Sequence, residues 1–538
     1  MINKHKNFFN IKGLLLVSGF SILTLASCTA GFDNLNHHEA NEEMMGVDNL
    51  KTGSFFTQML RNVVPFKDGT HDDGTYQIAQ GLTSDLYSGY LTTTIDRDNG
   101  VHNGSYSFVQ GWIGQTFKCG FTDVMPAWQS IVEIARELNQ PEVEALATIV
   151  KVEAMHRVAD SYGPIPYINF GSGSLVNLYD GLDDVYKRFF EELDTSIDNL
   201  SDFYNGNPGS ALMADYDLVY GGDVKKWLKF ANTLRLRLAL RVVYAEPGLA
   251  QAEAVKSLSH PLGVIEEVAD RAELKHSSKL IYHHPLHEIA YNFNGGEVRM
   301  SASMDAYLNG YKDPRRGAYF KPASDGNYHG VRLGISGSTT NYKGAQISNL
   351  NVDDSTTPIV WMNAAESYFL RAECAIRNWN GMGLNDAKEL YNKGIRVSFE
   401  ENNLQGADNY LNDESSKPIA FTDVFGKNST TQAPSSITIK WKDAGQEEML
   451  ERIITQKWIA CYPNGPEGWA EFRRTGYPRL ITVANNNSNG TVDTNIQICR
   501  ISFPQSEYNT NETGVNSGIA KLGGQDTGGT KLWWDKKD

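Results

Sequence analysis

The strongest constraint on the fold is a helical repeat of apolar residues in eight segments of the chain. In residues 183–203, for example, Tyr186, Phe189, Leu193 and Ile197 recur at three- and four-residue steps, with charged residues between them. The eight segments form four successive pairs: 124–138 and 142–162, 183–203 and 223–246, 361–378 and 385–401, 446–462 and 466–474. Consecutive helices joined by turns favour antiparallel helix pairs of the tetratricopeptide type, although no repeat consensus recurs. We therefore predict an all-α dominated fold with four tetratricopeptide-like helix pairs.

Segment 223–246 is ambiguous, because its centre, LRLRLALRV, alternates as a half-buried strand would. Three observations favour a helix. The segment is long, its alternating part lacks β-branched residues, and Trp227, Ala231, Leu234 and Leu238 fall on one helical stripe. Leucine and arginine are also both good helix formers. We predict a helix here.

Long polar insertions separate the helix pairs and make up the other half of the chain. They cover residues 68–120, 270–358, 405–437 and 485–538, and they are rich in Gly, Asn, Ser, Thr, Asp and Tyr. Irregular segments of this length inside a compact domain are usually functional. We expect a helical frame that carries large polar loops.

The N-terminus has the pattern of an export signal. A cationic start precedes an apolar run over residues 13–26, which is too short to span a bilayer comfortably and ends Leu25-Ala26-Ser27-Cys28. This ending is typical of a bacterial lipobox, in which Cys28 is acylated and becomes the new N-terminus. The alternative is an ordinary signal peptide with a cysteine near its cleavage site. Several acyl chains on one residue would give a stable membrane anchor.

We divide the chain into three parts on this basis. Residues 1–27 are predicted to be a lipoprotein signal peptide, and the polar, acidic stretch 28–50 a flexible tether. Residues 51–538 are predicted to form a single ligand-binding domain.

The overall charge argues against a nucleic-acid partner. The net charge is −15 and the pI about 5.3, whereas neutralising phosphates requires clustered Lys and Arg. The apolar fraction of 41% and the charged fraction of 21% are those of a globular protein.

The sequence gives little support for a metal site. His283, His284 and His287 are close together, but Pro285 breaks the local helix that would align two imidazoles, so a polar loop is the simpler interpretation. The stretch Asp96-Arg-Asp-Asn-Gly100 resembles the start of a calcium loop but has the wrong spacing, so structural calcium is a minor possibility and no cofactor is expected. Four cysteines lack metal-ligand spacing, and their pairing cannot be read from the sequence: Cys119, Cys374, Cys461 and Cys499.

No catalytic motif stands out either. The stretch GISGS at residues 334–338 lacks the final glycine and the strand–turn–helix context of a nucleophile elbow. Carboxylate pairs such as Glu191 with Glu192, or Glu366 with Glu373, lie on periodic helices, where a solvated or salt-bridged face is the default explanation. The sequence therefore predicts a binding protein and not an enzyme.

Aromatic residues in the polar insertions are the best candidates for ligand contacts. Flat rings beside amides and hydroxyls suit sugars, because stacking desolvates the C–H face while polar groups replace water at each hydroxyl. The alternative for each residue is that its ring pins a loop to the frame. The candidates are Tyr87, Tyr90, Trp112, Tyr291, Phe293 and Tyr328.

The densest aromatic stretch, residues 458–478, has a different explanation. Trp458 and Tyr462 are four residues apart in one predicted helix, and Trp469 and Phe472 are three apart in the next. Amphipathic packing between two helices accounts for this spacing, so we expect core residues here and not a ligand platform.

Several motifs together resemble the SusD/RagB outer-membrane lipoproteins. Each is weak alone, but they follow the family's order over nearly the whole mature chain. They are Cys28, Asp160-Ser-Tyr-Gly-Pro-Ile-Pro-Tyr167, Asp313-Pro-Arg315, Ala365-Glu-Ser-Tyr-Phe-Leu-Arg-Ala-Glu373, Tyr391-Asn-Lys-Gly-Ile395, Gln456-Lys-Trp458, Glu471-Phe-Arg-Arg-Thr-Gly476 and Arg500-Ile-Ser-Phe-Pro504.

The resemblance implies a surface lipoprotein of a Bacteroidetes-type bacterium, anchored in the outer membrane. Such proteins have a helical fold with four tetratricopeptide-like pairs, capture oligosaccharides without catalysis and deliver them to a SusC-like TonB-dependent transporter. The family's ligand contacts lie in variable loops, so no site residue is carried over. Alternatives are the same role for peptides or another nutrient, a surface glycoside hydrolase, or a scaffold lipoprotein without a small ligand.

Overall fold

The computed structural model describes residues 47–67, 74–96, 100–292, 296–336 and 340–537. The chain divides into two units, Met1–Thr52 and Gly53–Asp538, and only the start of helix α4 is described in the first. The predicted signal peptide and Cys28 therefore lie outside the described residues. The predicted tether boundary at residue 50 falls inside α4, which begins at Val47.

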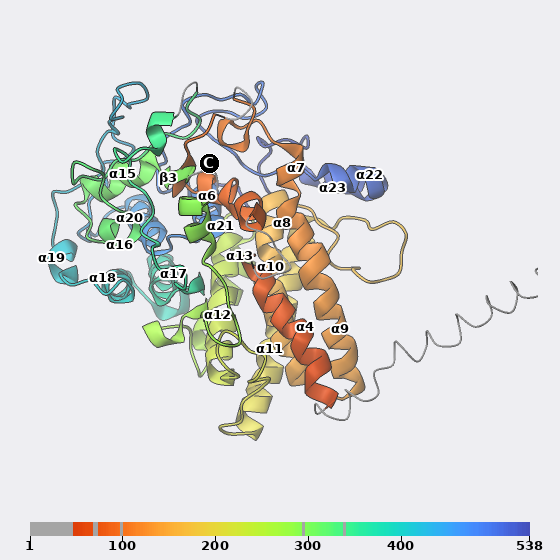
Figure 1. Ribbon diagram of the computed structural model, residues 1–538. Helices are drawn as coiled ribbons and strands as arrows, with labels where there is room; N and C mark the ends of the chain where they lie inside the picture. The colour runs from red at the N-terminus through yellow and green to blue at the C-terminus, as the bar shows by residue number, and fades with distance from the viewer. Residues whose placement is uncertain (1–46, 68–73, 97–99, 293–295, 337–339, 538) are drawn as a thin grey trace, which may run out of the picture. The chain divides into compact units, whose positions relative to one another are not determined.

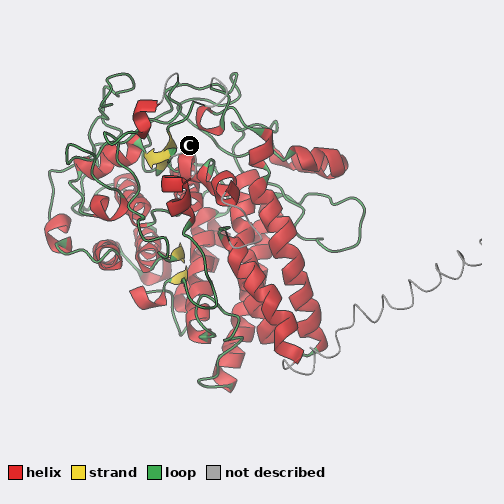
Figure 2. Cartoon of the chain, in the orientation of Figure 1, coloured by secondary structure: helices red, strands yellow, loops and turns green. Residues whose placement is uncertain are grey.

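Helices dominate the described residues (Figures 1 and 2). The longer ones are α4 (Val47–Val63), α9 (Met125–Glu137), α10 (Pro141–Tyr162), α11 (Leu182–Gly206), α12 (Val224–Arg241), α13 (Pro247–Ser259), α15 (Ala302–Gly310), α17 (Ala364–Ile376), α18 (Leu384–Glu401), α20 (Gln446–Ala460), α21 (Gly465–Thr475) and α23 (Glu512–Leu522).

Short elements occupy the insertions between the long helices. The short helices are α5 (Gly74–Tyr76), α6 (Ser84–Tyr87), α7 (Gln110–Ile113), α8 (Gln115–Lys118), α14 (Pro285–His287), α16 (Arg315–Tyr319), α19 (Ala407–Leu411) and α22 (Gln505–Thr510). The π- and 3₁₀-helical turns are η1 (Gln77–Gly81), η3 (Asn103–Ser105), η4 (Cys119–Val124), η5 (Val268–Asp270), η6 (Glu288–Asn292), η8 (Thr340–Lys343) and η9 (Trp379–Gly381). Strands β1 (Leu91–Thr93) and β3 (Val298–Met300) pair antiparallel, as do β2 (Ala272–Leu274) and β4 (Ile359–Met362).

All eight predicted helices are present, and each predicted pair is in contact: α9 with α10, α11 with α12, α17 with α18, and α20 with α21. The helical interpretation of segment 223–246 is confirmed by α12, which is buried along nearly its whole length. The Leu–Arg alternation is compatible with a helix because residues on every face of α12 are buried. It does not indicate a strand with one solvent-exposed face. The helix-dominated fold is thus confirmed.

Two boundaries differ from the sequence prediction. Segment 223–246 ends as a helix at Arg241, and a separate helix, α13, begins at Pro247, where the missing N–H of proline is tolerated in a first turn. Segment 361–378 begins with the end of β4, and α17 starts only after Asn363, whose side chain accepts a hydrogen bond from the Glu366 amide at 2.8 Å.

The aromatic stretch 458–478 is core, as predicted. Trp458 and Trp469 are each 1% exposed. The indole N–H of Trp458 donates to the Ser88 carbonyl at 2.8 Å, and that of Trp469 donates to the Ile498 carbonyl at 3.0 Å. These bonds satisfy the polar end of each ring, so both tryptophans fix loop segments onto α20 and α21.

Buried ion pairs join five helices at the centre of the frame. Arg237 of α12 pairs with Glu366 of α17 at 2.8 Å and with Glu153 of α10 at 3.2 Å. Lys457 of α20 pairs with Glu467 of α21 at 2.6 Å. The core ion network, as we call it, comprises Glu153, Asp160, Arg237, Arg241, Glu366, Glu373, Lys457, Glu467, Glu471 and Arg474.

The network explains the carboxylate pair that the sequence analysis weighed on α17. Glu366 and Glu373 are salt-bridged, as the default interpretation proposed, but they are at most 1% exposed instead of lying on a solvated face. Isolated buried charges would be very costly, and pairing with arginine and lysine offsets that cost.

The polar insertions gather beyond one end of helices α9–α12, as the green loops of Figure 2 show. Within the described part of the chain, no helix has the length and apolar character needed to cross a bilayer. The frame therefore presents its irregular segments together, and the candidate ligand contacts lie among them.

Candidate functional site

Two of the six candidate aromatics lie in the core. Tyr90 is 0% exposed, its ring lies 5.2 Å from that of Trp458, and its hydroxyl donates to the Trp458 carbonyl at 2.6 Å. Tyr87 is 4% exposed and its ring lies 5.2 Å from that of Trp469. Both rings are buried, so neither has a face that a ligand could contact. They hold their loops against the helical frame, which was the alternative interpretation, and they are not candidate ligand contacts.

Tyr291 lies at the end of a row of three flat rings. His283 precedes α14, His287 ends it, and Tyr291 lies in η6, which continues α14, so the three side chains are spaced four residues apart. The centroids of His283 and His287 are 6.4 Å apart, and those of His287 and Tyr291 are 5.2 Å apart. Pro285 begins the short helix, where proline is accepted, and does not break it as the sequence analysis assumed.

Hydrogen bonds fix the orientation of each ring in the row. The Tyr291 hydroxyl donates to the Leu350 carbonyl at 2.6 Å. His287 Nδ1 lies 2.7 Å from the Val352 carbonyl, which makes Nδ1 the protonated nitrogen of the neutral ring. His283 Nδ1 lies 2.9 Å from a Glu288 carboxylate oxygen, and the His283 side chain is 60% exposed. These hydrogen bonds therefore fix the orientation of all three rings.

A charged pair flanks the tyrosine at the end of this row. Lys321 Nζ lies 5.1 Å from the centroid of the Tyr291 ring and forms an ion pair with Asp353. The hydrogen bond between them raises the pKa of Lys321 and lowers the pKa of Asp353. We call these five residues the ring platform: His283, His287, Tyr291, Lys321 and Asp353.

Tyr328 lies on neighbouring backbone. The Arg316 guanidinium lies 5.0 Å from the Tyr328 ring centroid, and Arg316 also donates to the Asn309 side-chain oxygen at 3.1 Å. Asn351, two residues before Asp353 of the ring platform, donates to the Gly317 carbonyl beside Arg316 at 2.9 Å. Backbone contacts thus connect the segment under Tyr328 to the segment under the platform.

Trp112 lies apart from the ring platform. It is half-buried on α7 beside the exposed Gly111, and α7 and α16 are well separated in Figure 1. Phe293 lies outside the described residues. So does part of the proposed calcium loop, between Asp96 and Gly100, and the described residues contain no cluster of three or more His, Cys, Asp or Glu that could hold a metal.

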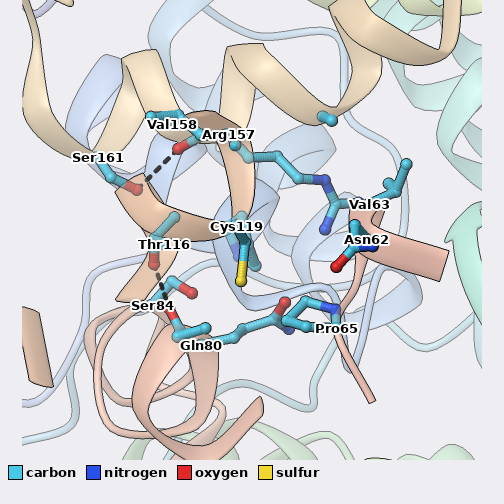
Figure 3. Close-up of a pocket in the computed structure, with 14 residues that line it drawn as sticks. Asn62, Val63, Pro65, Gln80, Ser84, Thr116, Cys119, Arg157, Val158 and Ser161 are labelled. Atoms are coloured by element: carbon cyan, nitrogen blue, oxygen red, sulfur yellow. Dashed lines mark hydrogen bonds between the residues drawn. The ribbon is translucent and has the colours of Figure 1, made fainter. Parts of the chain in front are cut away.

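A cavity beside α10 is too small for a sugar. It lies between α10 and the segments around Asn62, Gln80 and Thr116, as Figure 3 shows, and its volume is about 40 Å³. This volume suits a few water molecules. Cys119 lines the cavity as a free thiol, and burial raises its pKa to about 11, so it is a poor nucleophile.

The other three cysteines among the described residues are also buried and free: Cys374, Cys461 and Cys499. Desolvation raises the pKa of Cys461 and Cys374. The thiols therefore behave as small apolar side chains in this fold.

The ring platform includes residues that sequence reasoning set aside. The sequence predicts a polar loop, with metal binding as the alternative, for His283 and His287, although their spacing to Tyr291 gives three flat side chains at i, i+4 and i+8. That signal was available in the sequence. No local sequence signal marks Lys321 and Asp353, because they reach the platform from distant segments of the chain.

A helical frame that presents rigid ring faces and polar groups in its loops defines a ligand-binding protein. The chain belongs to the SusD-like family, described as SusD and RagB outer membrane lipoproteins, whose family model matches residues 33–535. This membership confirms the resemblance seen in the motifs.

Solved structures agree with this assignment. A chitin-binding SusD homologue from Flavobacterium johnsoniae is 37% identical, with a TM-score of 0.84 over 90% of this chain and 98% of that one. A SusD homologue from Bacteroides uniformis is 36% identical, with a TM-score of 0.83 over 91% and 100% of the two chains. One from Bacteroides thetaiotaomicron is 35% identical, with a TM-score of 0.80 over 90% and 99%. No curated protein matches the chain.

Proposed function

We propose that this protein binds oligosaccharides at the cell surface without catalysis and delivers them to a SusC-like TonB-dependent transporter. The observation that carries the proposal is the ring platform, a row of oriented flat side chains beside a lysine–aspartate pair on a SusD-like frame. Acylation of Cys28 would tether the protein to the outer membrane.

The platform suits a sugar for physical reasons. The face of Tyr291 would cover the apolar face of a pyranose, the His287 ring, inclined to it by 53°, would border the sugar, and Lys321 and Asp353 would donate and accept hydrogen bonds at its hydroxyls. Such a surface is small and polar, so affinity per site would be modest, which suits a protein that must release its cargo. The fixed hydrogen bonds beneath the rings reduce the entropic cost of binding.

Oligomers of N-acetylglucosamine are the first ligands to test, since one relative binds chitin. In calorimetric titrations, we expect saturable binding that increases with oligomer length. Tyr291→Ala should weaken this binding by about 1–3 kcal/mol, the usual cost of losing a central aromatic contact.

Tyr204→Ala is the matched control, because Tyr204 is a half-buried tyrosine on the frame helix α11. It should leave the affinity unchanged. Equal loss in both variants, or none in Tyr291→Ala, would contradict the assignment of the platform. A glycan and peptide array would reveal whether another cargo binds instead.

Catalysis is tested by incubating pure protein with labelled oligosaccharides, since turnover would overturn the binding function. A glycoside hydrolase needs two carboxylates facing each other across a cleft. The pair Glu366 and Glu373 is instead held by Arg237 and Arg474 in the core.

The membrane anchor and the transporter are tested in cells. Cys28→Ala should release the protein from the outer membrane fraction. Affinity purification of the lipidated protein should recover a TonB-dependent transporter, and its repeated absence would refute the delivery role.

A further inference from the structure

A second pocket, with a volume of about 350 Å³, opens at the C-terminal end of α21. Its walls come from the last turn of α21, from residues 476–480 and 495–499, and from the C-terminal segment 531–537. The volume lies within the range of small-ligand sites. The pocket shares no residue with the ring platform.

Arg473 is the unusual residue of this pocket. It is 7% exposed, and its guanidinium lies 3.5 Å from the ring centroid of Trp469 and 4.9 Å from that of Trp534. Its Nη1 donates to the carbonyls of Asp160 and Cys499 at 2.6 and 2.9 Å. Its Nη2 is buried without a hydrogen-bond partner among the described residues.

Arg473 forms no direct ion pair, although the nearby carboxylates of Asp160 and Asp535 favour its charged form. In the part of the chain that the structure describes, no carboxylate oxygen lies within 4.0 Å of its guanidinium, whereas the adjacent Arg474 pairs with Glu373 at 2.7 Å and with Glu471. Burial lowers the pKa of Arg473 to about 10, so the side chain remains cationic at neutral pH. A buried cation without a paired anion is costly, and a bound anion would offset that cost.

The other charged groups at the pocket are mostly cations. Lys531 pairs with Asp535 at 3.3 Å, and Lys537 pairs with Glu447, outside the pocket, at 2.6 Å. Arg479 lies 3.7 Å from Glu451, also outside the pocket. The lining thus holds four cations against one carboxylate: Arg473, Arg479, Lys531 and Lys537 against Asp535.

Apolar and amide groups complete the pocket. Phe472 and Leu480 are largely buried, each 9% exposed, and Ile496 is 52% exposed. Asn495 and Gln497 also line the pocket, and the Gln497 side-chain oxygen accepts a hydrogen bond from the Tyr106 hydroxyl at 3.3 Å. Such a lining offers an apolar face for a sugar ring and hydrogen-bonding groups for its hydroxyls.

We propose that this pocket is a binding site for an acidic sugar, with the carboxylate of a uronic acid residue acting as the counter-ion of Arg473. The carboxylate lies toward Arg473 and Lys531, the ring covers Leu480 and Ile496, and the amides bind the hydroxyls. This site would add acidic glycans to the ligands of the protein, independently of the ring platform.

The test compares four probes by calorimetry at low ionic strength: glucuronate, methyl glucoside, acetate and sulfate. We expect saturable binding of glucuronate that is about tenfold tighter than binding of the other three. Added salt should weaken it, since exposed charges contribute. If methyl glucoside bound as tightly as glucuronate, the charge would play no role in binding. If sulfate or acetate bound as tightly, the site would bind anions in general and not an acidic sugar. Either result would overturn the proposal.

Variants at the rim leave the buried Arg473 intact. Replacing both Lys531 and Arg479 by glutamine should weaken glucuronate binding about fivefold or more, while Lys279→Gln, at a lysine that likewise pairs with one aspartate on the surface, should not. Asp535→Asn should tighten binding, because it removes the competing carboxylate. No saturable binding, or no change in the double variant, would overturn the proposal.

Discussion

Glu373 shows how single residues hold the buried charges of this fold. It is 0% exposed and contacts Arg474 at 2.7 Å and Arg377 at 2.8 Å. Glu373→Gln removes the paired carboxylate from Arg377 and leaves Arg474 with Glu471 alone, so we expect a loss of about 3–5 kcal/mol in the free energy of unfolding. Chemical denaturation monitored by circular dichroism measures it. Glu389→Gln, at an exposed position of α18, is the control and should change stability little.

Trp112 remains a predicted ligand contact, and its environment permits a clean test. It is half-buried on a four-residue helix and packs against the edge of the hydrophobic core, so part of its ring faces solvent. Trp112→Ala should weaken binding of an N-acetylglucosamine oligomer by about 1–3 kcal/mol while the melting temperature changes by only a few degrees. Normal binding, or unfolding of the domain, would show that Trp112 pins α7 to the frame instead.

Tyr90 and Tyr291 show what sequence reveals about single residues. Both stand among small polar residues in long insertions, so their local sequence is nearly equivalent. Their environments differ because α20 places Trp458 against Tyr90, whereas Tyr291, beside His287, meets the Leu350 carbonyl and Lys321. Such partners are hundreds or tens of residues away, and no local pattern contains them.

The start of α17 illustrates how a single cap sets an element. The Asn363 side chain accepts from the Glu366 amide at 2.8 Å and donates to the Ala460 carbonyl of α20 at 2.8 Å. Asn363→Ala removes both bonds and should cost about 1–2 kcal/mol in thermal or chemical unfolding. Asn363→Ser restores a capping oxygen and should recover part of the loss. If both variants match the wild type, the cap does not stabilise α17.

Most long helices were predictable because their apolar stripes are local in sequence. The elements that sequence reasoning missed have tertiary causes. Helix α13 (Pro247–Ser259) follows α12 after a short turn and lies beyond the predicted segment 223–246, where the sequence analysis assigned no element. Strand β4 contains only four residues, and it exists because β2, from a distant insertion, pairs with it. The ring platform also depends on such distant pairing, through Lys321 and Asp353.

At the scale of the whole molecule, the core ion network makes the fold sensitive to acid. Burial alone would raise the pKa of Glu153, but Arg237 and Arg157 outweigh it and hold that pKa at about 2. Arg474 and Arg377 likewise lower the pKa of Glu373, and Arg241 and Lys457 lower that of Glu467 against the effect of burial. Each of these carboxylates binds protons more weakly in the folded protein than in the unfolded chain.

Two buried aspartates act in the opposite direction. Burial raises the pKa of Asp85 and of Asp305 to about 6, so both bind protons more tightly in the folded protein. Their hydrogen-bond partners are neutral: the Tyr76 hydroxyl donates to Asp85 at 2.7 Å, and the Gly330 amide donates to Asp305 at 2.7 Å. Their contribution to stability is therefore present in acid and is lost as the pH rises from about 4 to about 6.

The two groups of carboxylates together predict a stability maximum between about pH 4 and pH 5. The stabilisation from the network carboxylates is complete above the unfolded pKa of about 4.3 and is lost as the pH falls toward 2, at about 3 kcal/mol for a group such as Glu153. Denaturant titrations from pH 3 to pH 8 should therefore show a steep fall on the acid side and a shallower one above pH 5. Asp85→Asn should flatten only the shallower limb, because it removes a group that titrates there. A profile without an acid limb would mean that the network carboxylates have ordinary pKa values in the folded protein, and the ion pairs would then contribute little to its stability.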